Sequence, residues 1–377
     1  MVEIQDILRE HGNDYRKQHK LPHSHHKAMK AMEQCRTAEL GGHMDVCDEC
    51  GVVNISYNSC RNRHCPKCQT LKREKWMDAR KSDLLDVGYF HVVFTIPSEI
   101  NTIVFQNQRE LYSLLFRAAS ETLQELATNR KYLGARIGFA AILHTWGQNL
   151  IHHPHIHCVV PGGGLNEAGS WIKSRKKFFI PVKVMSRKFR GKFLALLREI
   201  PLEFHGSISE LNDPVIWQRL LSTLYAKEWV VYCKSPFKNA ACVVEYLGRY
   251  THRVAISNNR ILSCEDGMVT FRRRDYRDNN KQKVMTVTAE EFIRRFLIHI
   301  LPDRFMKIRH YGLLANRDKG ERLALCRRIT RTQEPAERLT TDELLMKMLG
   351  RDIRICSHCG NGKMQTRYSI SRSPPAA

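Results

Sequence analysis

A short histidine-rich run in the middle of the chain constrains the fold more than any other feature of the sequence. It reads HHPHIHCVVPGGG and contains His155 and His157, which are separated by one apolar residue. Alternate side chains of a β-strand point to the same face, so both imidazoles should face a cleft while Ile156, Cys158 and Val160 face a core. Two neutral imidazoles on one face are suited to a divalent metal ion. The run therefore predicts a strand that carries a metal site on one side.

Two tyrosines about a hundred residues further on extend this interpretation. Tyr246 and Tyr250 lie in the segment EYLGRYTHR, and in a helix near residues 240–249 they would share one face. Tyrosines at this spacing usually pack in a core or an interface, but next to a histidine pair in a basic chain we interpret them as nucleophiles. A pair of metal-binding histidines together with two tyrosines indicates phosphoryl transfer through a tyrosine nucleophile. Three flanking side chains are expected to bind strand phosphates: Arg249, His252 and Arg253.

The metal site needs a third ligand, and the preceding strand offers two. His144 and Gln148 have the same parity on that strand, so both can point at the cleft. We prefer Gln148 because it lies nearer the turn and His155, with His144 as the alternative. One oxygen and two nitrogens with open positions would suit Mg²⁺ or Mn²⁺. His152 and His153 fall in the turn and are expected to face solvent or DNA.

The charge of the chain points to nucleic acid. The 377 residues contain 61 Lys and Arg against 38 Asp and Glu, a formal net charge of +23 that is spread along the chain. Residues 171–192 interleave basic side chains with Phe178, Phe179 and Phe189, a pattern that can follow phosphates and stack on unpaired bases. The predicted DNA-binding residues in this segment and in a later basic cluster are Lys176, Lys177, Arg272 and Arg273.

Thirteen cysteines in a chain that we expect to be cytosolic indicate metal ligands rather than disulfides. The pairs Cys47-x2-Cys50 and Cys65-x2-Cys68 predict one structural, tetrahedral zinc site. Cys356-x2-Cys359 forms only half a site, so partial ligation or chance is about as good an interpretation as a further zinc ion. Four more residues between positions 35 and 64 offer a second site: Cys35, His43, Cys60 and His64.

The pattern of apolar residues predicts an α+β fold. We expect a basic helix to about residue 34, a connecting helix over 72–86, strands over 88–97 and 136–147, and helices over 101–129 and near 214–226. Strand, helix, strand, turn and strand describe an antiparallel sheet flanked by helices, preceded by a small zinc-binding domain. The expected division is 1–72 for the zinc-binding domain, 73–300 for the catalytic domain, and 301–377 for a basic region with a disordered tail over 369–377.

Several classes of protein are disfavoured. No apolar run approaches the length of a membrane span, and the polar N-terminus does not resemble a signal peptide. A glycine-rich phosphate loop is missing, which argues against a helicase or ATPase motor.

Taken together, the motifs resemble the rolling-circle insertion-sequence transposases of the two-tyrosine HUH class, which have an N-terminal zinc-binding domain. The motifs that carry the resemblance occur in family order: SYNSCRNRHCPKCQ (56–69), HVVFTIP (91–97), HPHIH (153–157), YLGRYTHRVAISN (246–258) and RHYGLLANR (309–317). The resemblance covers residues from about 35 to 330. Each motif alone is weak, and their combination is specific.

The resemblance implies a single-strand DNA endonuclease and strand transferase with an HUH-type sheet. One tyrosine would attack the end of the element, forming a 5′-phosphotyrosine and freeing a 3′-hydroxyl that host replication enzymes extend. His155 and His157 would be the metal ligands, and Tyr246 and Tyr250 the nucleophiles. The implied partners are single-stranded DNA at transposon ends, target DNA and host replication proteins, with no membrane and a bacterial, nucleoid-associated location.

Other functions remain open at this stage. A plasmid or phage replication initiator or relaxase would use the same chemistry. A zinc-dependent DNA-binding regulator would keep the histidines and tyrosines for structure alone. A zinc hydrolase would use His155 and His157 with a bound water and would form no covalent adduct.

Overall fold

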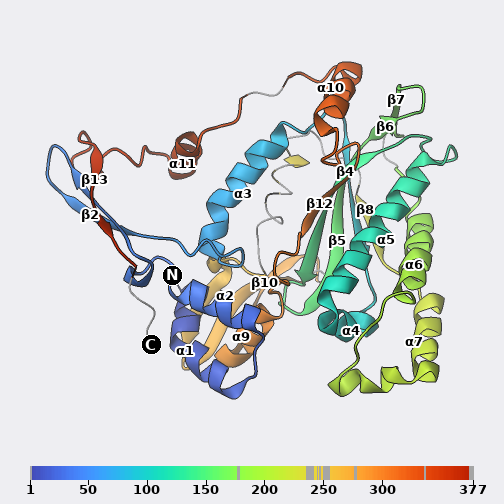
Figure 1. Cartoon of the computed structure of the whole chain (residues 1–377), viewed down its shortest axis with the longest axis horizontal. Helices are drawn as coiled ribbons and strands as arrows, with labels where there is room; N and C mark the ends of the chain where they lie inside the picture. The colour runs from blue at the N-terminus through green and yellow to red at the C-terminus, as the bar shows by residue number, and fades with distance from the viewer. Residues whose placement is uncertain are drawn as a thin grey trace.

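The structure is a computed structural model, and it describes residues 2–175, 179–234, 242–243, 245, 248, 255–275, 278–334 and 337–372. Three bodies of secondary structure stand out in Figure 1: a central sheet with its helices, a group made by the N-terminal helices and a second sheet, and a small sheet that contains β2 Val53–Tyr57 and β13 Met364–Ile370. The α+β class that the sequence predicts is confirmed.

The central sheet has five antiparallel strands in the order β12-β4-β5-β3-β8. Their bounds are β3 Tyr89–Thr95, β4 Gly138–Trp146, β5 His152–Pro161, β8 Val231–Lys234 and β12 Ile308–Gly312. Ile156, Cys158 and Val160 of β5 are fully buried in the main core, as the alternation of the histidine run predicts.

Helices cover the core face of this sheet. They are α4 Asn101–Gln106, α5 Gln108–Thr128, α6 Val182–Leu197 and α7 Pro214–Ala226, and Figure 1 shows α5 and α6 beside the sheet. Phe94 and Phe139 of the strands pack with Phe116 of α5 and Phe189 of α6 in one cluster. Buried aromatic side chains of this size contribute the most apolar area to the core.

The opposite face of the sheet is only partly covered. Tyr89, Ile142 and Val159 pack there with Trp76 of helix α3, Pro66–Lys81. Proline at the first position of α3 suits the helix start, because its missing N–H would have no partner there. This face also carries His155 and His157, and the uncovered part forms the cavity described below.

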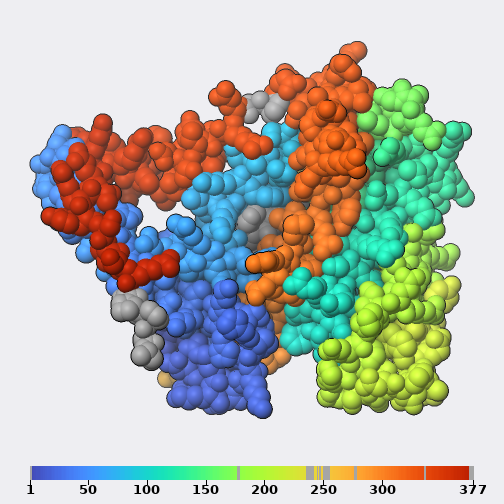
Figure 2. All heavy atoms as spheres, in the orientation of Figure 1, coloured from blue at the N-terminus to red at the C-terminus, as the bar shows by residue number. Residues whose placement is uncertain are grey.

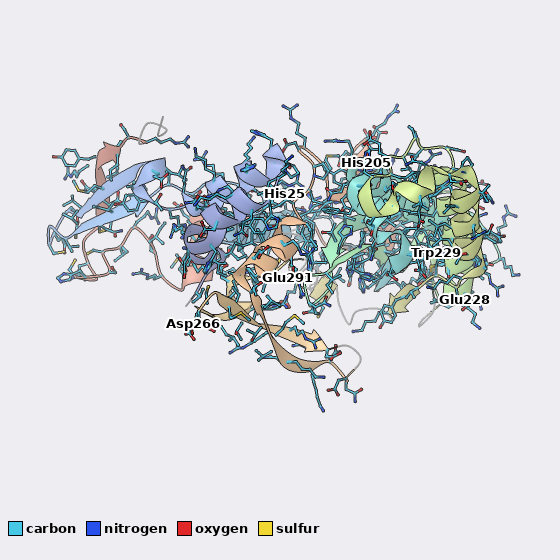
Figure 3. The ribbon with its side chains drawn as sticks, turned by 90° about the horizontal axis from the view of Figure 1, so that it is seen from below. His25, His205, Glu228, Trp229, Asp266 and Glu291 are labelled. Carbon is cyan, nitrogen blue, oxygen red and sulfur yellow. The ribbon has the colours of Figure 1, made fainter. Side chains whose placement is uncertain are left out.

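The N-terminal helices join a second sheet rather than forming a unit of their own. Helices α1 Ile4–Gln18 and α2 His23–Glu33 share a core with β9 Ile261–Glu265, β10 Met268–Asp275, β11 Lys281–Thr288 and α9 Ala289–Leu297. Figure 3 shows this group from below, with Asp266 at the β9–β10 turn and Glu291 on α9. Thr288 caps α9 by accepting a hydrogen bond from the backbone N–H of Glu291.

The third sheet pairs a strand near the C-terminus with the hairpin β1–β2, the N-terminal hairpin. Its strands, in the order β13-β1-β2, are β13 Met364–Ile370, β1 Gly42–Cys47 and β2 Val53–Tyr57. Helix α3 leads from this region to the central sheet (Figure 1). Ser369 and Ile370, which the sequence analysis assigned to a disordered tail, pair with His43 and Gly42.

The remaining elements are short or peripheral. They are η1 Ala38–Leu40, η2 Ser98–Ile100, η3 Gly206–Asn212, η4 Asn258–Arg260, the hairpin β6 Gly163–Leu165 and β7 Trp171–Lys173, α10 Lys319–Thr330 and α11 Thr341–Leu349. Among the described residues, no helix is both long and apolar enough to cross a membrane.

Two expected helices have different bounds. The helix expected to residue 34 is two helices, because Pro22 precedes α2 as its N-cap and interrupts the run. The connecting helix expected over 72–86 begins at Pro66 and ends at Lys81. Packing also crosses the expected domain limits at 72 and 300, since the N-terminal helices share a core with α9 and β12 lies in the central sheet.

Candidate active site and metal centres

An open cavity of about 840 Å³ lies on the uncovered face of the central sheet. Its floor is formed by the ends of β3, β4 and β5 and by the turn at residues 147–151, and β10 contributes Arg273, Arg274 and Asp275 to its rim. The cavity is therefore shared between the central sheet and the second sheet.

Three histidines meet on the floor of this cavity. His144 and His155 are direct cross-strand partners in β4 and β5, and His157 lies two residues further along β5 on the same face. The ligand atoms of the three rings lie within 4.8 Å of one another. This spacing allows the three nitrogens to bind one metal ion.

Neighbouring groups hold two of these rings in a defined orientation. His155 donates its Nδ1–H to the carbonyl oxygen of His153 at 2.6 Å. Nδ1 of His157 lies 2.7 Å from Nε2 of His91 on β3, and the two rings stack with centroids 5.0 Å apart. Both contacts use Nδ1 and leave Nε2 as the nitrogen able to bind a metal ion, an arrangement typical of metal-bound histidine.

Burial keeps these imidazoles neutral. It lowers the pKa of His155 to about 4, and it lowers the pKa of His157 well below the ordinary value, with His144 and His155 adding smaller effects. A neutral imidazole has the lone pair that a metal ion requires, so both rings are ready to bind a metal at neutral pH.

The histidine that joins the pair is His144, which the sequence analysis gives as the alternative third ligand. Strand register explains its position, because β4 sets His144 opposite His155 and ends at Trp146, and the turn that follows carries the preferred Gln148 beyond the paired part of the strand. Gln148 lines the same cavity, and its backbone carbonyl accepts a hydrogen bond from Arg260 at 2.6 Å.

The turn beneath the cavity and the start of β5 are held by two buried side chains, His299 just after α9 and Tyr112 of α5. His299 lies 3.0 Å from the carbonyl of Leu150 through Nε2 and 3.1 Å from the hydroxyl of Thr145 through Nδ1. His152, expected to face solvent or DNA, is instead buried and bonded to the hydroxyl of Tyr112 at 2.9 Å. The strand begins at His152 and carries this ring to the core face, opposite in parity to His155.

Only some of the predicted nucleophiles and DNA-binding residues lie in the part of the chain that the structure describes. Arg273 lies at the rim of the cavity and pairs with Asp275 at 3.6 Å. The carbonyl oxygen of Arg272 accepts a hydrogen bond from Arg260. The remaining predicted positions lie outside the described residues: Tyr246, Tyr250, Arg249, His252, Arg253, Lys176 and Lys177.

The basic segment at 171–192 corrects part of the DNA-binding prediction. Phe179 and Phe189 are buried in the main core and cannot stack on bases. Lys188 pairs with Glu125, and Lys192 pairs with Glu125 and Glu121 of α5. These two lysines of α6 are therefore paired with glutamates of the same chain.

Eight of the thirteen cysteines gather in two groups of four, whose composition differs from the prediction. The first group, the knuckle cluster, consists of Cys35, Cys60, Cys65 and Cys68. The sulfur of Cys68 lies 3.5 Å from those of Cys35 and Cys60, and the sulfurs of Cys65 and Cys35 are 3.8 Å apart. Four sulfurs around one zinc ion are about 3.8 Å apart for Zn–S bonds of about 2.3 Å, so this cluster fits tetrahedral zinc.

The second group, the end-joining cluster, consists of Cys47, Cys50, Cys356 and Cys359. The two pairs predicted to share one site therefore belong to different clusters, and the C-terminal half-site completes the second. The Cys-x2-Cys spacing at residues 356–359 was visible in the sequence. Only the pairing of β1 with β13 brings Cys356 and Cys359 next to Cys47 and Cys50.

The two histidines proposed as zinc ligands belong to neither cluster. His43 lies on β1, and its Nε2 is 3.3 Å from a carboxylate oxygen of Asp45 on the same strand. His64 is buried beside Arg63 and Lys307, and burial followed by these two charges lowers its pKa to about 3.

Comparisons with known proteins agree with this arrangement. Residues 138–322 match the family described as "Putative transposase", and residues 7–96 match the family described as "Transposase zinc-binding domain". The second range contains all four cysteines of the knuckle cluster but only half of the end-joining cluster. No solved structure matches the chain.

Two relatives extend the likeness over most of the chain. One is "Putative transposase y4qJ" of Sinorhizobium fredii, 49% identical over 97% of this chain and 94% of the relative. Another is the "Transposase for insertion sequence element IS801" of Pseudomonas savastanoi pv. phaseolicola, 30% identical over 78% of this chain and 70% of the relative. With a zinc-binding region before the histidine sheet and this degree of identity, the chain belongs to the IS91-type family of insertion-sequence transposases.

Proposed function

We propose that this transposase cleaves single-stranded DNA at the ends of its element and transfers the strand through a covalent tyrosine intermediate, as in rolling-circle transposition. The observation that carries the proposal is the group of three histidines, His144, His155 and His157, on the floor of a cavity with arginines at its rim. Such a site can hold a cation and a phosphate together.

The three imidazoles would bind a divalent cation, Mg²⁺ or Mn²⁺. A set of three nitrogen ligands favours Mn²⁺ over Mg²⁺, because Mg²⁺ prefers oxygen. When bound, the cation would polarise a non-bridging oxygen of the scissile phosphate. His91 and the carbonyl of His153 would keep the rings of His157 and His155 oriented for this task.

Tyr246 and Tyr250 are the proposed nucleophiles. The phenol of one tyrosine loses its proton, and its oxygen forms a new bond to phosphorus while the bond from phosphorus to the 3′-oxygen breaks. The 3′-oxygen takes up a proton and leaves as a hydroxyl, and the 5′-phosphate stays on the tyrosine. Attack by a 3′-hydroxyl on this phosphotyrosine reverses the exchange and joins a strand, so no external energy source is needed.

The DNA strand is proposed to enter across the rim formed by β10. Arg273 and Arg274 lie at that rim, where guanidinium groups can bind phosphates on either side of the scissile bond. The other proposed phosphate contacts are Arg249, His252, Arg253, Lys176, Lys177 and Arg272. In the cell, host replication enzymes would extend the freed 3′-hydroxyl, and the protein would act at the bacterial nucleoid.

A covalent adduct tests the proposal. The protein is incubated with single-stranded DNA carrying an end of the element and Mn²⁺, and the products are separated on a denaturing gel. We expect a protein-linked DNA band that disappears in the Tyr246→Phe/Tyr250→Phe variant and persists in Tyr225→Phe, a change at an exposed residue of α7. Cleavage without an adduct would point to a metal-bound water instead, and binding without cleavage would point to a regulator.

A second arm tests the metal ligands. His144→Ala should abolish cleavage at every Mn²⁺ concentration that supports the unaltered protein, whereas Gln148→Ala should retain it. If Gln148→Ala lost cleavage while His144→Ala retained it, Gln148 rather than His144 would be the third ligand.

A further inference from the structure

Two turns of the same sequence pattern meet where the chain ends come together. One is Cys47-Asp-Glu-Cys50-Gly on β1 and the other is Cys356-Ser-His-Cys359-Gly before β13. The paired residues are 312 and 306 positions apart in the chain. Figure 2 shows the C-terminal residues lying against the N-terminal hairpin at the edge of the molecule.

The four sulfurs of the end-joining cluster are spaced for a metal ion. Cys47 and Cys359 lie 3.8 Å apart through their sulfurs, as do Cys50 and Cys356, and all four sulfurs lie within 4.8 Å of one another. A disulfide would need about 2.05 Å, whereas tetrahedral zinc needs sulfurs about 3.8 Å apart. The spacing fits zinc and not a disulfide.

Both turns aim backbone N–H groups at the sulfurs. The N–H of Cys50 donates to Cys47 Sγ at 3.5 Å, and the N–H of His358 donates to Cys356 Sγ at 3.4 Å. The glycine after each pair has a positive φ, +69° at Gly51 and +78° at Gly360. Hydrogen bonds of this kind stabilise thiolates, the form that binds zinc.

The two turns also approach each other as closely as the side chains permit. A Cβ atom at Gly362 would lie 2.4 Å from Cys47 Sγ, so only glycine fits that position. The carboxylate of Asp48, inside the first turn, accepts a hydrogen bond from the N–H of Lys363 at 2.7 Å. These contacts hold the two halves of the cluster in register.

Apolar packing does not account for this arrangement. Cys47 and Cys356 are 3% and 1% exposed, yet neither belongs to a hydrophobic cluster of the described residues. Val53 and Ile55 of β2 are about half exposed, so the sheet has little core of its own. A small unit of this kind generally needs a further support such as disulfides or a metal ion, and the sulfur spacing here excludes disulfides.

We propose that Cys47, Cys50, Cys356 and Cys359 bind a second structural zinc ion, which fastens the C-terminal end of the chain to the N-terminal hairpin. The zinc lies outside the proposed reaction. Before the cluster, the C-terminal segment is held along α3, where the N–H of Leu339 donates to Asp78 at 2.9 Å. The zinc and the β1–β13 pairing then secure its far end.

Metal content tests the proposal independently of DNA cleavage. By mass spectrometry of metals, the Cys356→Ser/Cys359→Ser variant should contain one zinc per chain fewer than the unaltered protein, and Cys233→Ala should lose none. Cobalt substitution should give two equivalents of thiolate-to-cobalt charge transfer in the unaltered protein and one in the double variant. Equal zinc content in both proteins, or one equivalent of cobalt–thiolate in the unaltered protein, would overturn the proposal.

A variant that keeps the metal ion distinguishes the loss of a ligand from a loss of folding. Cys359→His should retain the zinc while its cobalt spectrum shifts toward mixed sulfur and nitrogen ligation, a change that a loss of folding cannot produce. An unshifted spectrum with full metal content would show that Cys359 is not a ligand.

The fastening role has its own test. A protease cleavage sequence is inserted between Gln333 and Glu334 in the full chain, and the cut protein is passed over a sizing column. The C-terminal fragment should stay bound in the zinc-loaded protein and separate in the Cys356→Ser/Cys359→Ser background. Equal retention in both would mean that zinc does not fasten the chain end.

Discussion

His91 shows how a residue without a motif can govern the site. It lies on β3, two residues before the cross-strand partner of His157, and its Nε2 meets His157 Nδ1 at 2.7 Å. If His157 binds a metal through Nε2, its Nδ1 carries the proton and donates it to His91. His91 must then remain neutral, and burial lowers its pKa to about 4. His91 is therefore a positioning residue.

Replacing His91 should weaken metal binding without removing a ligand. We expect His91→Phe to lower the affinity for Mn²⁺ about 10- to 100-fold, the usual effect of losing an outer hydrogen bond to a metal-bound histidine. Calorimetric titration with Mn²⁺ measures the change. The control is His205→Gln, at a side chain that is 73% exposed and is labelled in Figure 3. An affinity within twofold of the unaltered protein would refute the role of His91.

At the scale of elements, helices from both sides hold the turn between β4 and β5. From α5, Tyr112 reaches His152 at the start of β5. Past the end of α9, His299 reaches the turn, while Arg295 of that helix donates to the carbonyl of Asn149 at 3.0 Å. The cavity floor thus depends on packing between helices and strands distant in sequence.

Removing one bond of this network should be costly because its partner stays buried. Tyr112→Phe leaves His152 without the hydroxyl and should lower the free energy of unfolding by about 1–3 kcal/mol. Urea unfolding followed by circular dichroism measures this difference. Tyr225→Phe, at a side chain that is 58% exposed, should change stability by less than about 0.5 kcal/mol. Equal effects of the two changes would mean that the Tyr112–His152 bond contributes nothing.

At the scale of the whole molecule, many histidines are buried and neutral. Burial lowers the pKa of nine histidines, which come from the central sheet, the N-terminal helices with the second sheet, and the segments between them. They are His25, His64, His91, His152, His153, His155, His157, His299 and His310. Each binds a proton more readily in the unfolded chain, where its pKa is about 6.5.

The folded protein should therefore be sensitive to acid. The contribution of these neutral histidines to the free energy of unfolding is fully present above pH 6.5. It is lost as the pH falls toward 4, by up to about 1.4 kcal/mol per pH unit for each histidine. Thermal unfolding at intervals from pH 7.5 to 4.5 should show a steep fall in Tm below pH 6.5. Zinc content at each pH separates this loss from protonation of the thiolates. A Tm that is level from pH 7.5 to 5 would contradict the prediction.

The sequence alone determined what local pattern encodes. Alternation in β5 placed Ile156, Cys158 and Val160 in the core and the histidine pair on the other face. The spacings Cys47-x2-Cys50 and Cys65-x2-Cys68 predicted zinc-binding turns, because two sulfurs at that spacing can meet one ion. The order of apolar patterns predicted an α+β fold, since each period reflects a single element.

Only the tertiary structure decided which of these parts meet. Cys47 and Cys50 share a cluster with Cys356 and Cys359 because β13 pairs with β1 across more than 300 residues. His144 joins the histidine pair because the register of β4 and β5 sets it opposite His155. Pairing of distant strands depends on the packing of the whole chain, so spacing within one segment could not specify either partner.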